Sequence, residues 1–302
     1  MRRFFKIVIG LVALIVVAVG AAIVLIPRER VVALATDQVR AATGRELALT
    51  GDLSPSIWPV LGVRTGPVTL SNAEWGAADH LVSAGAAEIG IELMPLISGE
   101  VKVAALRLVD PVVSLEVNDQ GLGNWVFDKQ ADSGAGGDSG AGRELPKIAL
   151  PEAVIKNGTI RFTDARTGQR IELTELDLQA ALSAIDAPLT LEGSGIWNGA
   201  RASLDARIET PAAMIEERNT SVMLALASDP ATLTFEGDVQ AGPGDPIPLI
   251  DGALVVDVAN PAKAVAWASG TAAPAGLSQI GAVKLDAKVS AGEDGLDVTA
   301  KG

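Results

Sequence analysis

Cysteine and tyrosine are absent from this sequence, histidine occurs once, and lysine plus arginine number 24 against 37 aspartate plus glutamate residues. A chain without cysteine forms no disulfide, no cysteine-ligated zinc site and no iron–sulfur cluster. The lone His80 has no second histidine or cysteine with which to hold a metal or activate a nucleophile. The net charge of -13 argues against a nucleic-acid partner, since phosphate recognition needs a clustered basic surface. These absences predict a protein that is not an enzyme and uses no metal or cofactor.

The chain begins with an apolar run at residues 7–26 that contains only aliphatic residues, alanine and glycine. As a helix, this run would span about 30 Å, the hydrocarbon thickness of a bilayer. The basic residues that precede it predict a cytoplasmic N-terminus and a body across the membrane. A signal peptide cleaved after Ala33–Ala35 is the alternative. The run is longer than a typical signal segment of about 7 to 15 residues, so residues 1–26 favour an uncleaved tail and anchor.

Residues 27–43 carry apolar side chains at helical spacing, and Gly44 follows them as a stop signal. They predict a short amphipathic helix that caps the end of a sheet. From Glu46 onward the hydrophobic period changes to two, which is typical of strands with one apolar and one polar face. About fifteen strands match this pattern. The predicted fold class is mainly β: an N-terminal transmembrane helix and a short amphipathic helix, followed by an antiparallel sheet with short helical interruptions.

Local turn and cap signals divide the strand-rich part of the chain. Asn198-Gly199 separates two alternating runs within residues 189–209 and predicts a type I′ hairpin. Two short helical interruptions are predicted at residues 211–217 and 261–268, because each begins with proline after a capping residue. The capping residues are Thr210 and Asn260.

The alternation predicts which side chains form the apolar face of the sheet. If this face is open, it would accommodate lipid, whereas in a β-sandwich two such faces would pack together, and periodicity alone does not separate these alternatives. The candidate lipid-contacting residues are Leu176, Leu178, Leu204, Ile208, Leu224, Leu226, Leu233, Phe235, Leu254 and Val256.

The stretch 131–146 is rich in glycine, serine and aspartate over most of its length and predicts a flexible linker or loop. It suggests a division of the chain into parts. These are the tail and anchor at 1–26, the capping helix at 27–43, a first β unit at 44–130, the linker at 131–146, and further β units at 147–302.

Known catalytic motifs are missing from the sequence: it has no Walker loop, no nucleophile elbow and no complete dinucleotide fingerprint. Glu172, Glu175 and Asp177 are close enough in sequence to form an acid pair or a calcium site. Charged residues are, however, expected on alternate positions of an exposed strand, and we interpret these three as a solvated face. The scattered tryptophans are interpreted as local plugs of the core or of turns.

A set of motifs in the first half of the chain has the order and spacing of one protein family. The motifs are Thr43-Gly44-Arg45, Pro59-Val60-Leu61-Gly62, Leu70-Ser71-Asn72-Ala73, Pro95-Leu96-Ile97-Ser98-Gly99 and Gly121-Leu122-Gly123-Asn124-Trp125. They resemble the N-terminal region of AsmA-like proteins, and a weaker resemblance continues at 156–164 and 173–178.

The resemblance implies a single-pass protein of the bacterial inner membrane, with a cytoplasmic N-terminus and a periplasmic body, that acts in outer-membrane biogenesis. The family is related to chorein-like lipid bridges, which implies a curved, taco-like β-groove that binds or conducts phospholipid. The implied partners are membrane lipids, the inner membrane through residues 7–26, and an assembly partner in the periplasm or outer membrane. The alternative is a non-conducting scaffold that assists or regulates outer-membrane protein assembly. No catalytic residues come with the resemblance. The motif residues Gly62, Gly99 and Gly121 are expected at turns, and Pro59 and Pro95 at strand ends.

Overall fold

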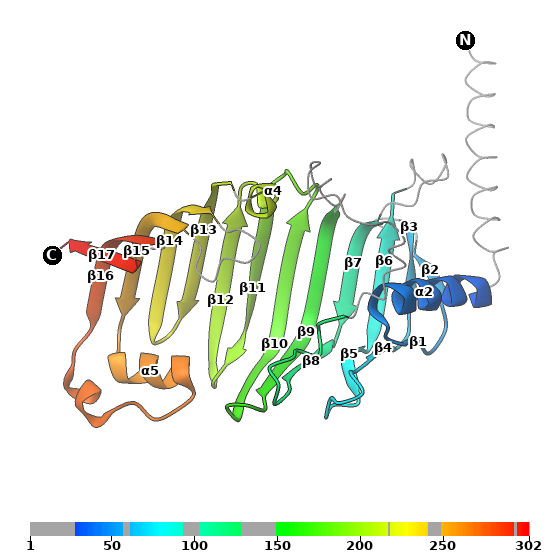
Figure 1. Ribbon diagram of the computed structural model, residues 1–302, viewed down its shortest axis with the longest axis horizontal. Helices are drawn as coiled ribbons and strands as arrows, with labels where there is room; N and C mark the ends of the chain where they lie inside the picture. The colour runs from blue at the N-terminus through cyan, green and yellow to red at the C-terminus, as the bar shows by residue number, and fades with distance from the viewer. Residues whose placement is uncertain are drawn as a thin grey trace, which may run out of the picture.

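The computed structural model describes residues 28–56, 61–92, 103–127, 149–216, 218–240, 249–292 and 295–301. These residues form a curved, unclosed sheet of 17 strand segments, with few helices (Figure 1). Strand β1 lies toward one end of this sheet and β17 at the other. The prediction of a curved, mainly β protein is confirmed.

The first eight segments are halves of long bent strands that follow one another in the sheet. For example, β3 pairs with β6 while β4, which continues β3, pairs with β5, which precedes β6. The segments are β1 (Leu47–Leu49), β2 (Ser54–Ser56), β3 (Leu61–Thr65), β4 (Val68–Ser71), β5 (His80–Ala84), β6 (Ala86–Ile91), β7 (Val103–Val109) and β8 (Val112–Val117).

The bends of neighbouring strands lie beside one another and form a corner across the sheet. Between β7 and β8 the chain turns at Asp110, whose φ of 48° is unusual for a residue other than glycine. The amide of Asp110 donates to the carbonyl of Lys156, and the side chain of Asn157 donates to Asp110 Oδ1 at 2.6 Å. Asn157 itself has a φ of 53°. Short polar side chains that tolerate the left-handed region therefore support the corner.

The later strands are long and each pairs with the next along the chain. One pairing is parallel: β9 runs alongside β7 and β8, whereas the other pairs are antiparallel. The antiparallel prediction was wrong at this one place. Parallel neighbours need a long crossover connection rather than a tight hairpin, and the stretch between Val117 and Leu150 is long enough to provide one. The strands are β9 (Leu150–Asp164), β10 (Gln169–Leu182), β11 (Leu189–Trp197), β12 (Ala200–Ile208), β13 (Thr220–Ser228), β14 (Ala231–Gln240), β15 (Leu249–Val258), β16 (Val283–Gly292) and β17 (Gly295–Lys301).

The predicted hairpin is confirmed, since Asn198 and Gly199 have φ values of 46° and 80° between β11 and β12. Of the helices, α2 (Arg28–Thr43) contacts β1, and α4 (Pro211–Ile215) and α5 (Pro261–Ser269) lie at opposite ends of the strands (Figure 1). A 3-10 turn, η1, follows at Ala275–Gln279.

The cap predictions had different outcomes at the two short helices. Asn260 Oδ1 accepts a hydrogen bond from the amide of Lys263 at 2.9 Å, which confirms the cap of α5. The expected Thr210 cap was wrong, because the Thr210 side chain makes no cap hydrogen bond with α4. Its amide instead donates to the hydroxyl oxygen of Thr220 at 2.9 Å. This bond joins the strand ends on both sides of α4.

The predicted membrane anchor at residues 7–26 and the predicted linker at 131–146 lie outside the described residues. Among the helices that are described, none has the length and apolar character needed to cross a bilayer. The division of the chain into units stays a prediction. The sheet itself continues from β7 and β8 to β9, which come before and after the linker stretch.

Candidate functional site

Apolar side chains line up in rows across β12 to β16. In an antiparallel pair, directly opposed residues point to the same face, so the strand register shows which side chains lie together. One row continues through five strands without interruption and through Gly193 to Leu178 on β10. Its members on β12 to β16 are Leu204, Leu226, Leu233, Val256 and Leu285.

A second row runs parallel to the first, two residues further along each strand. It joins Ala206, Leu224, Phe235, Leu254 and Ala287. The predicted residue Ile208 begins a third row with Val222. Leu176 lies on β10 beside a bulge and borders the same apolar surface. The structure thus brings the ten predicted residues to one surface, which we call the apolar face.

The apolar face is only half-covered. Nine of its ten predicted residues are half-buried, and Leu176 alone is fully buried, with 8% of its surface exposed. Among the described residues, the largest side chain that is fully enclosed is Asn124, which lies elsewhere. A packed sandwich would bury large aliphatic side chains in the space between its sheets. The described part of the chain therefore presents an open apolar face.

Glycines on this face leave room for neighbouring large side chains to pack against the backbone of the sheet. A Cβ atom at Gly193 or Gly195 would lie 2.9–3.0 Å from methyl groups of Leu178 and Leu173. At the opposed pair Gly237 and Gly252, a Cβ would lie 2.9 Å and 2.7 Å from the ring of Phe235. These large side chains therefore pack flat against the backbone of the glycines and do not project far above the sheet.

Helix α5 encloses part of the apolar face. Between it and β10–β13 lies a cavity of about 400 Å³. Its described lining is apolar or small and includes no charged residue; the large side chains are Leu173, Leu176, Leu178, Trp197, Leu204, Leu226 and Trp267. We call this space the α5 cavity. Trp197 and Trp267 were interpreted from sequence as separate plugs, but they meet here.

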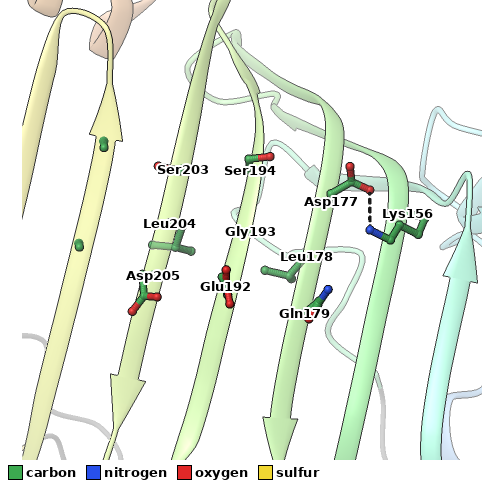
Figure 2. Close-up of a pocket in the computed structure, with 12 residues that line it drawn as sticks. Lys156, Asp177, Leu178, Gln179, Glu192, Gly193, Ser194, Ser203, Leu204 and Asp205 are labelled. Atoms are coloured by element: carbon green, nitrogen blue, oxygen red, sulfur yellow. Dashed lines mark ion pairs between the residues drawn. The ribbon is translucent and has the colours of Figure 1, made fainter.

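The opposite face of the same strands is polar. It carries a depression of about 440 Å³ whose lining includes Asp177, Glu192 and Asp205 (Figure 2). The Nζ atom of Lys156 on β9 lies 3.6 Å from Oδ1 of Asp177 on the adjacent strand β10. Glu172 and Glu175 form ion pairs with Arg161 at 2.9 Å and Arg201 at 2.6 Å. Each of the three carboxylates singled out from sequence thus has its own cationic partner, and all six side chains of these pairs are about half-exposed. Within the described residues, no cluster of potential metal ligands occurs.

Several family-like motif residues meet in a buried polar cluster that sequence reasoning missed. Asn124, with 0% of its surface exposed, donates to Asn72 Oδ1 and to the carbonyl of Ser114, both at 2.8 Å. Its own Oδ1 accepts from the amide of Glu116 at 3.0 Å. Arg45 donates to the carbonyls of Asn72 at 3.0 Å and Asn124 at 3.3 Å. The cluster joins three motifs that are far apart in sequence.

The Glu116 carboxylate completes this cluster. It accepts from the amides of Ala77 and Ala78 at 2.8 and 2.9 Å and from Asn72 Nδ2 at 3.1 Å. These bonds fix the loop between β4 and β5 onto β8. The motifs already contain these short polar residues. That the residues contact one another could not be predicted, because the contacts depend on how the strands pair.

A second polar contact ties the end of β9. Asp164, with 5% of its surface exposed, accepts from Arg166 Nη2 at 2.7 Å and from Arg166 Nε at 3.0 Å. The side-chain hydrogen bonds from Arg166 lower the pKa of Asp164, and they raise the pKa of Arg166. The amide of Ala165 donates to the carbonyl of Val117, so this turn also links β9 to β8.

The expectations for individual motif residues were partly right. Gly121 lies in a turn with a φ of 85°, as predicted. The expectation for Gly62 was wrong, because it lies inside β3, where a Cβ would come within 2.5 Å of the Ile89 carbonyl oxygen. A close approach of two strands therefore requires glycine there. His80 is exposed at the start of β5. Pro59, Pro95 and Gly99 lie outside the described residues.

Comparisons with known proteins agree with the motifs. The model of the AsmA family matches residues 1–253. The chain is also similar to protein AsmA of Escherichia coli strain K12, with 30% identity over 115 residues. That alignment covers 38% of this chain and 18% of the relative, so the match spans less than a fifth of the relative's length. No solved structure matches the chain. Because the family match covers most of the sequence, this chain belongs to the AsmA family.

Proposed function

We propose that this protein binds or conducts phospholipid along the apolar face of its sheet and acts in outer-membrane biogenesis. The observation that carries the proposal is the set of uninterrupted apolar rows across β12 to β16, which the described residues leave half-covered. Contact between water and so large an apolar surface is unfavourable. Acyl chains bound to the face would shield it from water.

The chemistry of the face suits acyl chains. Each methylene removed from water contributes about 0.8 kcal/mol, so a chain of about fourteen carbons would gain on the order of 10 kcal/mol before its ordering costs. The first two rows have no charged member on β12 to β16. Recognition would therefore rest on the chains, with the headgroup left toward solvent.

The proposal includes the location of the protein. Residues 7–26 would anchor it in the inner membrane, with Arg2, Arg3 and Lys6 holding the N-terminus in the cytoplasm and the sheet in the periplasm. Helix α2 would then connect the anchor to β1, the first segment of the sheet. In this arrangement the β1 end of the sheet lies near the membrane, and the apolar face lies further along the sheet.

We propose no catalytic activity for this protein. The three carboxylates that could have formed an acid pair are each about half-exposed and paired with a separate cation. Lipid transfer by a groove needs no bond to be made or broken, so no cofactor enters the proposal.

The test replaces one member of the second row, Leu224→Asp, in the full-length chain. The matched control is Thr234→Asp, which places the same charge on an exposed position of the neighbouring strand and the opposite face. Phospholipid that co-purifies with each variant is quantified by mass spectrometry, and thermal unfolding is recorded on the same samples. The anchor carries the same lipid in every variant, so differences report on the sheet.

If the face holds lipid, Leu224→Asp should lower the bound phospholipid several-fold while the melting temperature falls by only a few degrees. On an open apolar face, water can reach and solvate the new carboxylate. The Thr234→Asp control should change neither quantity. If the same face is a closed core, the unpaired buried carboxylate should cost several kcal/mol, and the unmutated protein should carry no lipid beyond its anchor. That result would overturn the proposal and favour a scaffold in outer-membrane protein assembly.

A further inference from the structure

Helix α5 is held against the sheet by contacts that lie beside the α5 cavity. The Nε1 atom of Trp197 and the Nδ2 atom of Asn198 both donate to the backbone carbonyl of Trp267, at 3.0 and 2.6 Å. Asn260 caps the first turn of the helix, and Gly270 ends it with a φ of 69°. The turn of the β11–β12 hairpin thus fixes the last turn of α5 above the apolar face.

The floor of the α5 cavity is formed by small residues. Gly193 and Gly195 have no side chains, and Leu173 and Leu178 lie flat over them. Ala202, which is directly opposed to Gly195, adds only a methyl group. The cavity is therefore lined by the glycines of β11 on the side of the sheet and by Trp267 on the side of α5.

One polar atom at this place has no partner. Nε1 of Trp267 is buried, and no group among the described residues accepts its hydrogen bond. Such an atom is unfavourable in the folded protein, and an incoming acceptor would relieve it. The backbone of Trp267 is fixed by the hairpin while its ring nitrogen is untethered. The N–H of the ring is therefore available to an acceptor that enters the cavity.

We propose that the α5 cavity is a subsite for a single acyl chain of an ester-linked lipid, roofed by Trp267. This inference rests on the proposed lipid-binding function and names the place and chemistry of one binding position. The volume of about 400 Å³ falls at the lower end of small-molecule sites, which suits one chain rather than several. On entry of the chain, the N–H of the Trp267 ring donates to the ester carbonyl. The lining carries no charge, so the headgroup remains outside.

The first experiment uses phosphatidylcholine with bromine atoms on its acyl chains, exchanged into the full-length protein. Bromine quenches the fluorescence of tryptophans that it contacts. We expect quenching in the unmutated protein and loss of about half of that quenching in Trp267→Phe, because Trp197 also borders the cavity. The matched control is Trp75→Phe, which removes a tryptophan with 40% of its surface exposed and should leave the quenching unchanged. Quenching that is equal in both variants would overturn the subsite.

The second experiment tests the shape and the hydrogen bond. Ala202→Phe should fill the cavity and remove the quenching, whereas Thr232→Phe, on the exposed opposite face, should not. Unmutated protein should retain ester-linked phosphatidylcholine about fivefold better than the ether-linked lipid of equal chain length, which is the ratio expected for one hydrogen bond. Trp267→Phe should abolish this preference. An equal affinity of the unmutated protein for both lipids would overturn the carbonyl contact.

The two levels of the proposal fail in different ways. If the protein exchanges phospholipid but Trp267 is not quenched, the subsite is wrong and the open face remains the binding surface. If mass spectrometry detects no phospholipid beyond that of the anchor in the unmutated protein, the proposed function itself is wrong and the subsite falls with it.

Discussion

The two ends of this sheet are built on different physical principles. In β1 to β8 each long strand is bent; exposed polar side chains support the corner at Asp110, and a buried polar cluster around Asn124 joins β8 to the loop that follows β4. In β12 to β16 the pairing is continuous, without a shift of register between neighbouring strands. Among the described residues from β11 to the end of the sheet, positive φ angles occur only at turns, caps or a strand start.

This difference shows how one sheet can be stiff at one end and open at the other. A buried hydrogen-bond cluster has strict geometry, because each donor or acceptor left unpaired is costly. The bent end can therefore hold a fixed shape with few large apolar side chains in its interior. The continuous end has a regular ladder of backbone hydrogen bonds, so its shape survives without a layer of side chains above the apolar face. That freedom is what an open binding surface requires.

Among these changes, Asn124→Ala should lower the free energy of unfolding most, through its effect on the bent end of the sheet. The change leaves the Ser114 carbonyl, the Glu116 amide and Asn72 without their partner in a site that has no solvent access. We expect a loss of about 3 kcal/mol in the free energy of unfolding, measured by urea denaturation. Asp119→Ala, at an exposed position of the nearby turn, is the control and should stay within about 0.5 kcal/mol. An equal, small change in both variants would mean that the polar cluster does not stabilise this end of the sheet.

Gly252→Val should disturb the continuous end by a smaller amount. A Cβ at this position lies 2.7 Å from the Glu236 carbonyl oxygen and 2.8 Å from the Cα of Gly237, and it meets the ring of Phe235. We expect a loss of about 1 to 3 kcal/mol, because the strands must separate and the ring must leave its resting place. Gly276→Ala is the control, since a Cβ there meets no atom within 4 Å. Lipid content should also fall in Gly252→Val, as the ring rises above the apolar face.

Cleavage within residues 131–146 should have the smallest effect on the assembled sheet. The glycine- and serine-rich composition predicts that limited proteolysis cuts there first, near Gly136. Strands β7 and β8 nevertheless pair with β9 across the cut, through residues 105–109 and 112–117. The two fragments should therefore elute together from a native size-exclusion column and separate only in denaturant. Fragments that separate without denaturant would support the division into independent units.

The local features of the chain were predictable because they depend on neighbouring residues. The helix Arg28–Thr43 matches the predicted capping helix almost to the residue, and Asn198-Gly199 forms the expected turn. The ten apolar positions also followed from alternation, since successive residues of a strand point to opposite faces. Thr210 shows where such reasoning fails: its expected cap is absent, and its amide is bonded to Thr220 Oγ1 from the next strand.

The sequence by itself determined the strand periodicity, the apolar face and the motifs that led to the family. Only the tertiary structure decided that the face is open and that β9 runs parallel to β7 and β8. It also decided that Arg45, Asn72 and Asn124 meet in one cluster, and that Trp197 and Trp267 border one cavity. The physical reason is that alternation fixes the direction of each side chain but not what lies opposite it. Contacts between residues distant in sequence depend on strand register and on the bends, which are set by the packing of the whole sheet.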